Sequence, residues 1–194
     1  MARIRIGSKE ISDEAIRPYI IAEIGVNYYE VAEKYSLDLI DAAKLMIKEA
    51  RDAGADAVKF QIYKAEKLAS RYAKAYWDTR ANPVTSQYEL FKKYDKLDLD
   101  DYKELAKYAN SIGVDFIATP FDEESALFVA EVSPAIKVAS ADITNIPFLR
   151  HVARLGKPIL LSTGASNIAE IYEAIMTIVG EGNNDIAILH CILE

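Results

Sequence analysis

Short runs of apolar residues alternate along the chain with longer stretches in which apolar residues recur at helical spacing. The short runs are continuous rather than alternately apolar and polar, which is typical of parallel strands covered on both faces. The predicted strands are Tyr19–Glu23, Ala57–Gln61, Asp115–Thr119, Ala135–Val138, Ile159–Ser162 and Ile186–His190. The predicted helices are Ser36–Ala53, Asp98–Ile112, Glu123–Val132, Ile146–Leu155 and Asn167–Gly180, with Gly54 and Gly113 placed to end the first two.

Repeated β-then-α units favour an α/β fold with a parallel sheet. An open doubly wound sheet and a (β/α)₈ TIM barrel both fit this order, but the segment EIGVNYYE after the first strand lacks a Gly-rich phosphate loop. A whole barrel takes about 250 residues, and this chain of 194 residues shows about six of the eight βα units. We therefore expect residues 1–194 to form one barrel domain, incomplete at its C-terminus, and to be a fragment of a longer protein or half of a split one.

Two segments lie outside this repeat. MARIRIGSKEI, residues 1–11, is predicted to form a short β-hairpin before the first strand. The stretch from Ile62 to about Gln87 is long and rich in tyrosine, and it contains Pro83. It is interpreted as an excursion between a strand and the next helix, and loops of that length are usually functional or flexible.

Composition narrows the classes of protein. Apolar residues make up 51% and charged residues 27%, the balance of a soluble globular chain. The net charge of −7 argues against a nucleic-acid binder, which needs basic phosphate contacts. Cys191 is the single cysteine, so no intramolecular disulfide is expected. Without an apolar run of about 18 residues or a secretory signal, the expected location is the cytoplasm, with no membrane partner.

Nearly every predicted strand ends in a residue that can bind or transfer a chemical group. In chain order these residues are Glu23, Lys59 with Gln61, Thr119, Lys137 with Ser140, Ser162 with Thr163, and His190. In a parallel barrel the strand ends meet at one mouth, where barrel enzymes place their chemistry. Two lysines, several hydroxyls and one acid form a plausible anion site with an acid/base group.

Each of these residues also has an ordinary structural interpretation. Lys59 and Lys137 can extend along the rim with their ammonium groups in water. Thr119, Ser162 and Thr163 can cap the helices that follow them, which is the commonest task of Ser and Thr at such positions. The joint pattern favours the anion site over these separate explanations.

Metal ligation and hydrolase chemistry have less support. His190 taken alone is more often a satisfied core histidine than a ligand, and His151 falls within a predicted helix. With two histidines the chain has no HxH or HExxH spacing, so no metal site is predicted. No GxSxG segment occurs, which argues against a hydrolase triad.

Six stretches at the strand ends follow a recognisable order: IAEIGVN (Ile21–Asn27), AGADAVKFQ (Ala53–Gln61), IATPFD (Ile117–Asp122), IKVASADITNIPFL (Ile136–Leu149), GKPILLSTGAS (Gly156–Ser166) and ILHC (Ile188–Cys191). In wording and spacing they resemble the N-acetylneuraminate (sialic acid) synthase family, which includes legionaminic and pseudaminic acid synthases. One such motif is weak, whereas six in order are specific.

The resemblance implies a (β/α)₈ barrel transferase of carbohydrate and polysaccharide biosynthesis. Such an enzyme condenses phosphoenolpyruvate with an N-acetylated hexosamine, releases phosphate and forms a nine-carbon 2-keto-3-deoxy acid. Carried over by motif, the phosphoenolpyruvate ligands are Lys59, Lys137, Ser140 and Ser162, with Thr119 beside them, Gln61 lining the pocket and Glu23 as the acid/base carboxylate. Full-length members form homodimers.

The chain departs from the family pattern in places that matter. Tyr28, Tyr29 and Glu30 stand where the family has a histidine and a Gly-containing turn, which puts sugar handling by the first loop in doubt. The family's divalent metal, Mn or Mg, is held by histidines on later strands, so its ligands are not in this chain. The family's antifreeze-like C-terminal domain is also absent, and we expect little activity from this chain alone.

Two other functions remain open from the sequence. The chain can belong to another phosphoenolpyruvate-condensing barrel that makes sugar acids of seven or eight carbons. It can also be a non-catalytic partial barrel that serves as an assembly partner or ligand sensor. The sequence does not determine which hexosamine, and hence which nine-carbon acid, is involved.

Overall fold

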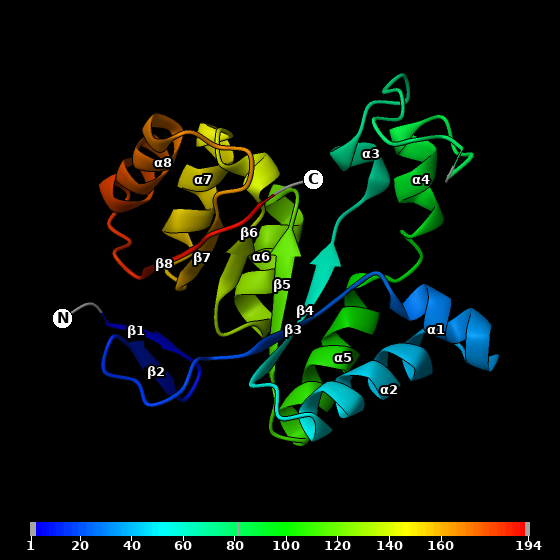
Figure 1. Ribbon diagram of the computed structural model, residues 1–194, viewed down its shortest axis with the longest axis horizontal. Helices are drawn as coiled ribbons and strands as arrows, with labels where there is room; N and C mark the ends of the chain where they lie inside the picture. The colour runs from blue at the N-terminus through cyan, green and yellow to red at the C-terminus, as the bar shows by residue number, and fades with distance from the viewer. Residues whose placement is uncertain (1–2, 81, 193–194) are drawn as a thin grey trace.

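The computed structural model describes residues 3–80 and 82–192 (Figure 1). Six parallel strands form one sheet in chain order. They are β3 (Ile21–Gly25), β4 (Ala57–Ile62), β5 (Asp115–Pro120), β6 (Ile136–Val138), β7 (Ile159–Ser162) and β8 (Ile186–Leu189). The result is a half-barrel, which confirms the predicted partial-barrel α/β fold. Parts of the predicted hairpin and domain, Met1, Ala2, Ala81, Leu193 and Glu194, lie outside the described residues.

The strands match their predicted positions with small shifts at the ends. Tyr19, the predicted start of the first strand, precedes β3 by two residues, and its hydroxyl donates to Asp115 Oδ2 at 2.7 Å. His190, the predicted end of the last strand, follows β8. The apolar runs therefore located all six strands.

The helices cover the outer face of the sheet (Figure 1). They are α2 (Leu39–Asp52), α5 (Leu99–Ser111), α6 (Glu123–Val132), α7 (Ile146–Arg154) and α8 (Ile168–Gly180). Val58, Phe60 and Phe116 of the strands face them in the main hydrophobic core, where the rings of Phe60 and Phe116 stack at 5.2 Å between centroids. Full burial of a large apolar side chain contributes roughly 1.5–3 kcal/mol, so this layer stabilises the packing of the helices on the sheet.

The structure corrects the first predicted helix. A separate helix α1 (Tyr28–Tyr35) precedes it, and Ser36 ends α1 with a left-handed φ of 54°. The next helix then begins at Leu39, because the Asp38 carboxylate accepts a hydrogen bond from Asp41 N at 2.7 Å and caps it. The predicted span Ser36–Ala53 is therefore three residues too long at its start.

The predicted hairpin is present as β1 (Arg3–Ile6) and β2 (Lys9–Ser12), paired antiparallel. Ile6 is fully buried in a second, smaller core. Its buried partners there are Ala57 of β4, Ile117 of β5, Leu160 of β7 and Ala135, which directly precedes β6. The hairpin thus covers the inner face of the half-barrel at the end where the strands begin (Figure 1).

Residues 63–98, between β4 and α5, form a structured segment that we call the excursion. It holds two short helices, α3 (Ala65–Leu68) and α4 (Gln87–Lys93), and extends beyond the predicted limit near Gln87. Asp95 joins its two ends by accepting hydrogen bonds from Lys64 Nζ at 3.1 Å and from Ala65 N at 2.9 Å. The excursion projects from the end of the sheet at which the strands finish (Figure 1).

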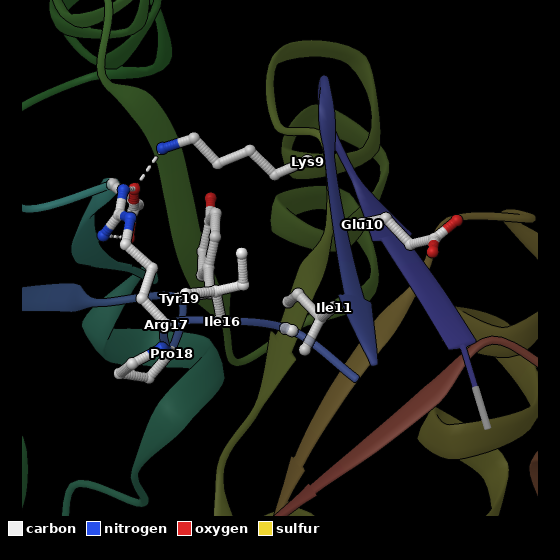
Figure 2. Close-up of a pocket in the computed structure, with 9 residues that line it drawn as sticks. Lys9, Glu10, Ile11, Ile16, Arg17, Pro18 and Tyr19 are labelled. Carbon is white, nitrogen blue, oxygen red and sulfur yellow. Dashed lines mark hydrogen bonds and ion pairs between the residues drawn. The ribbon is translucent and has the colours of Figure 1, made fainter. Parts of the chain in front are cut away.

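The buried carboxylate of Asp56 ties the hairpin to the start of β4. It accepts hydrogen bonds from Lys9 Nζ, from Arg17 at 3.1 Å and from the backbone N–H of Ile20 at 2.8 Å. Figure 2 shows Lys9 and Arg17 reaching the same point from two sides of a shallow hollow of about 370 Å³. Burial by itself would raise the pKa of Asp56, but the Ile20 N–H and the two cations outweigh it and hold the pKa at about 2.

Asp56→Asn is expected to destabilise the fold by about 2 kcal/mol at neutral pH. The folded pKa of about 2 lies below the ordinary value of 3.8. The carboxylate therefore stabilises the fold above about pH 4, and this contribution is lost as the pH falls toward 2. Urea unfolding of both proteins from pH 7 to pH 2.5 measures the difference, with Glu173→Gln, an exposed carboxylate, as the control. A difference that stays constant over this range would contradict the role of Asp56.

Candidate functional site

Strand register places the predicted charged residues on one face of the sheet. Glu23 pairs with Lys59 and Lys59 pairs with Ile117, while Lys137 pairs with Leu160. Paired residues of parallel strands share a face, and successive residues alternate between faces. The buried Ile117 and Leu160 belong to the inner core. Glu23, Lys59 and Lys137 therefore all point to the inner face.

Lys59 is the centre of a polar cluster at the strand ends. Its side chain is buried, and its ammonium group lies 2.7 Å from Glu23 Oε2 and donates to Thr119 Oγ1 at 3.1 Å. Glu23 itself is exposed, so the carboxylate of the cluster is accessible to solvent. Because the side chain is buried, Lys59 does not extend along the rim with its ammonium group in water, and that interpretation is wrong.

Lys137 places a second ammonium group on the same face. The side chain is buried, and Nζ donates to the carbonyl of Val138 at 2.7 Å. Burial and, to a smaller extent, the positive charge of Lys59 lower the pKa of Lys137 to about 8, although the negative charge of Glu23 opposes both effects. The charges of Lys59 and Glu23 are therefore near enough to act on Lys137. Because its side chain is buried, Lys137 does not extend along the rim in water either.

The hydroxyl residues at the strand ends do not cap the following helices. Helix α6 is capped by Asp122, whose carboxylate accepts from two backbone N–H groups, and α8 is capped by Asn167 in the same way. The capping interpretation of Thr119, Ser162 and Thr163 is therefore wrong. All three are buried at the ends of β5 and β7, where the inner-face lysines also lie.

Three further predicted residues lie at the same end of the sheet. Gln61 is half-buried near the end of β4, and its backbone carbonyl accepts from the Tyr102 hydroxyl at 3.2 Å. Ser140 begins the short 3₁₀ helix η1 (Ser140–Asp142) that follows β6. Within residues 3–80 and 82–192, the side chains of Gln61, Ser140 and Ser162 make no hydrogen bond to protein, so their polar atoms remain available to a ligand.

Asp142 joins this site, and the sequence patterns did not single it out. Its Oδ2 is buried without a hydrogen-bond partner in the described part of the chain, while Oδ1 accepts from Asn145 at 3.3 Å. Burial raises the pKa of Asp142, and the Asn145 amide and the charge of Lys137 oppose that rise. The position of Asp142 in the segment ASAD, directly after β6, was a signal for a site residue. The burial that distinguishes its carboxyl group is not visible in a sequence.

Tyr28, the first of the residues predicted to depart from the family pattern, lies in the main core on the outer face of the sheet. It is fully buried, packs on Phe60 with ring centroids 5.9 Å apart, and shares a hydrogen bond with the Tyr102 hydroxyl at 3.2 Å. Burial raises the pKa of its hydroxyl, so Tyr28 stays neutral. Tyr28 is therefore a core residue of helix α1.

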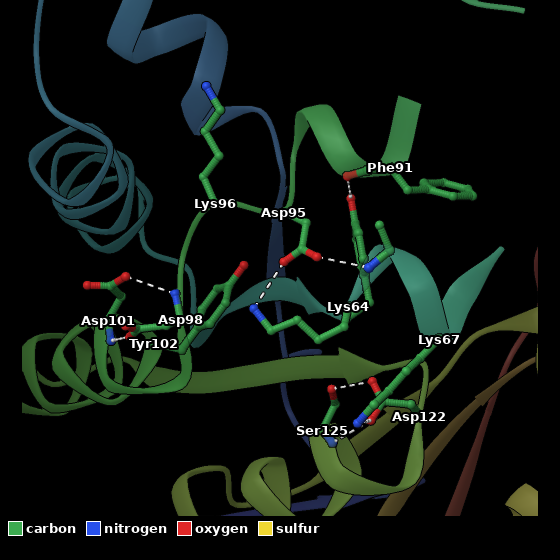
Figure 3. Close-up of polar contacts among 12 residues, drawn as sticks. Lys64, Lys67, Phe91, Asp95, Lys96, Asp98, Asp101, Tyr102, Asp122 and Ser125 are labelled. Carbon is green, nitrogen blue, oxygen red and sulfur yellow. Dashed lines mark hydrogen bonds and ion pairs between the residues drawn. The ribbon is translucent and has the colours of Figure 1, made fainter. Parts of the chain in front are cut away.

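Ion pairs hold the excursion over the ends of neighbouring strands (Figure 3). Lys67 of α3 lies 3.5 Å from Asp122 Oδ1 just after β5, and it also pairs with Glu124. On the other side, the ring of Tyr94 stands edge-on to Tyr29 of α1 at 5.1 Å, and the Tyr29 hydroxyl accepts from Lys96 N at 3.1 Å. The excursion is thus attached near the ends of β3, β4 and β5.

The histidines do not join the cluster. His190 is exposed beyond β8, and His151 lies in α7 as predicted, with Nε2 buried and unpaired among the described residues. Across the described ranges, no three His, Cys, Asp or Glu side chains form a group that could hold a metal ion. These residues therefore do not fit the divalent metal that the resemblance implies. No helix in the described chain has the length and apolarity to cross a bilayer.

Comparison with models of protein families gives a match over most of the chain. The model of the NeuB family matches residues 46–194, well over half of the chain. The chain belongs to the NeuB family. This assignment confirms the family suggested by the six motifs.

The curated relatives of this chain include named synthases and an uncharacterized protein. The N,N'-diacetyllegionaminic acid synthase of Campylobacter jejuni is 41% identical over 90% of this chain and 51% of its own length. Uncharacterized protein MJ1065 of Methanocaldococcus jannaschii is 38% identical over 99% of this chain and 51% of its own. The N-acetylneuraminate-9-phosphate synthase of Homo sapiens is 33% identical over 89% of this chain and 46% of its own. This chain thus spans about half the length of these NeuB-family relatives.

Solved structures confirm the fold. The N-acetylneuraminic acid synthetase of Leptospira borgpetersenii, in complex with citrate, has a TM-score of 0.79 and 27% identity. The match covers all of this chain and 60% of the synthetase chain. The spore coat polysaccharide biosynthesis protein SpsE of Bacillus subtilis has a TM-score of 0.77 and 34% identity. That match covers 100% of this chain and 49% of the SpsE chain.

The coupling between the inner-face charges makes a prediction about Lys137. Lys59→Ala is expected to raise the pKa of Lys137 above about 8, because a neighbouring positive charge is removed. Glu23→Gln is expected to lower that pKa, because a neighbouring negative charge is removed. Titration of ¹³Cε-labelled lysine by NMR measures both shifts.

Lys107→Ala is the matched control, since Lys107 is exposed on α5 and should leave the pKa of Lys137 unchanged. Shifts of the same sign in the Lys59 and Glu23 variants would show that the three groups do not share one electrostatic site.

Proposed function

We propose that this chain forms the phosphoenolpyruvate-binding part of a sialic-acid-type synthase. In the proposed reaction, phosphoenolpyruvate condenses with the open-chain aldehyde of an N-acetylated hexosamine. The products are a nine-carbon 2-keto-3-deoxy sugar acid and inorganic phosphate. Membership of the NeuB family and the synthase names of its relatives support this reaction class.

The observation that carries the proposal is the pair of buried ammonium groups on the inner face. Lys59 and Lys137 are 8% and 7% exposed, and Glu23 forms an ion pair with Lys59. Two buried cations of like charge are costly unless anions compensate them. A ligand that bears both a phosphate and a carboxylate supplies the compensating charge, which accounts for a site of this composition.

Each binding residue has a physically defined role in the proposal. Lys59 and Lys137 neutralise the phosphate and the carboxylate of phosphoenolpyruvate as point charges. Ser140 and Ser162 donate hydroxyl hydrogen bonds to the same ligand. Thr119 orients Lys59 through the hydrogen bond at 3.1 Å. Gln61 lines the pocket, and the hydrogen bond from the Tyr102 hydroxyl to its backbone carbonyl fixes its position near the end of β4.

Carbon–carbon bond formation requires proton movement at two places. Carbon 3 of phosphoenolpyruvate bonds to the aldehyde carbon, and the aldehyde oxygen takes up a proton. Water adds at carbon 2, loses a proton, and the bond from carbon 2 to the phosphate oxygen breaks. The exposed Glu23 carboxylate is placed to accept the proton of water, and Asp142, whose pKa is raised by burial, is suited to hold the proton for the aldehyde oxygen.

Acceptor choice and assembly belong to the same proposal. The names of relatives support an N-acetylated amino sugar as acceptor, as for the N,N'-diacetyllegionaminic acid synthase of Campylobacter jejuni. In this structure β3 and β8 each have one strand neighbour among the described strands. We therefore expect slow turnover from this chain alone, a homodimer for the full-length protein, and ligands for any divalent Mn or Mg outside the described residues.

Lys59→Ala and Lys137→Ala are each expected to weaken phosphoenolpyruvate binding by at least about tenfold, since a charge-assisted contact contributes about 1.5–3 kcal/mol. Isothermal titration calorimetry with phosphoenolpyruvate measures the dissociation constants. Lys107→Ala, an exposed lysine on α5, should bind as the wild type does. If Lys137→Ala binds as tightly as the parent, the proposed site is wrong.

Glu23→Gln is expected to separate binding from chemistry. The variant should bind phosphoenolpyruvate at least as tightly as the wild type, because the negative charge 2.7 Å from Lys59 is removed. Phosphate release in the presence of N-acetylmannosamine should fall by about 10²-fold or more, the usual loss for a general acid/base group. Faster phosphate release with arabinose 5-phosphate than with N-acetylmannosamine would point to a different sugar-acid synthase.

A further inference from the structure

The excursion differs in charge from the rest of the chain. Residues 63–98 contain eight lysines and arginines against five aspartates and glutamates, a formal charge of +3. Because the whole chain carries −7, the remaining residues carry −10. The positive charge is thus concentrated in one segment of an otherwise acidic protein.

Ion pairing removes only part of this positive charge. Lys64, Lys67 and Arg80 pair with carboxylates within the described chain. Five exposed cations of the excursion make no ion pair among the described residues: Arg71, Lys74, Lys92, Lys93 and Lys96. Three of them lie over tyrosine rings, which leaves their charge intact.

The location of the excursion relates this charge to the inner-face site. Its first residue follows β4 directly, two positions after Gln61. Lys67 attaches it to Asp122 just beyond β5, and Tyr94 attaches it to Tyr29 beyond β3. The segment is therefore fixed beside the strand ends that carry Glu23, Lys59 and Thr119 (Figures 1 and 3).

From these observations we infer that the excursion is an electrostatic guide for the anionic substrate. A trianionic ligand approaching a body of charge −10 is repelled. A fixed group of exposed cations beside the mouth reverses the sign of the field along the approach, which raises local ligand concentration and association rate by about 10- to 10³-fold. The five cations act over distance and do not contact the bound ligand. This inference rests on the proposed binding of phosphoenolpyruvate.

Charge reversal within the excursion tests the inference. The triple variant Lys74→Glu, Lys92→Glu, Lys93→Glu should bind phosphoenolpyruvate about tenfold more weakly than the wild type at about 0.01 M ionic strength, where fields extend roughly 30 Å. At about 1 M salt, where fields extend roughly 3 Å, the two proteins should agree within about twofold. Calorimetric titration of phosphoenolpyruvate provides both dissociation constants.

A control with the same change in net charge separates a local field from overall charge. Arg5, Lys107 and Lys157 lie in β1, near the end of α5 and just before β7, at the opposite end of the sheet. Their triple change to glutamate should weaken low-salt binding by less than about threefold. Lys74→Gln, Lys92→Gln, Lys93→Gln should fall between the wild type and the reversed variant, and circular dichroism checks the fold of each protein.

The outcomes distinguish this inference from the proposed function. If the wild type fails to bind phosphoenolpyruvate at any salt concentration, the proposed function fails. If it binds but the excursion and control triples weaken binding equally, or the excursion effect persists at 1 M salt, the guiding role is wrong. The role is also wrong if the excursion triple leaves the dissociation constant unchanged and instead dissolves self-association seen by sedimentation, since the cations would then serve a second copy of the chain.

Discussion

The two-residue period of a β-strand controls every other feature of this molecule. In β4, Val58 and Phe60 face the helices, while Ala57 and Lys59 face the inside of the half-barrel. A shift of one residue would place the ammonium group in an apolar layer, at a cost of several kcal/mol. The outer layer therefore sets the orientation of the inner-face charges, and the hairpin supplies apolar contacts below them. Helix packing and site geometry are consequences of the same alternation.

Much of the fold follows from the sequence because its strands are continuous apolar runs with helices of regular period between them. The six strands, the hairpin and five helices are predictable in this way. Helix α1 is not, because its eight residues are mostly polar or aromatic and its end depends on the left-handed Ser36. The limits of the excursion also escape prediction, since Asp95 joins segments 30 residues apart in the chain.

The candidate site shows the same division between local pattern and long-range contact. Strand-end position and motif resemblance are sufficient to select Glu23, Lys59 and Lys137, and strand register then places them on one face. Asp142 escapes notice because its character comes from burial, which depends on the surrounding elements. The burial of Tyr28 at the start of α1 is likewise not visible in the sequence.

Trp77 is the single tryptophan of the chain and lies within the excursion. Its indole N–H donates to the carbonyl of Val84 at 3.1 Å, across the turn of the segment, and its ring stands edge-on to Tyr76. The indole is therefore a built-in optical probe of one defined region. Its emission reports the local environment of that turn, free of signal from indoles elsewhere in the barrel, so fluorescence can follow the excursion without an attached label.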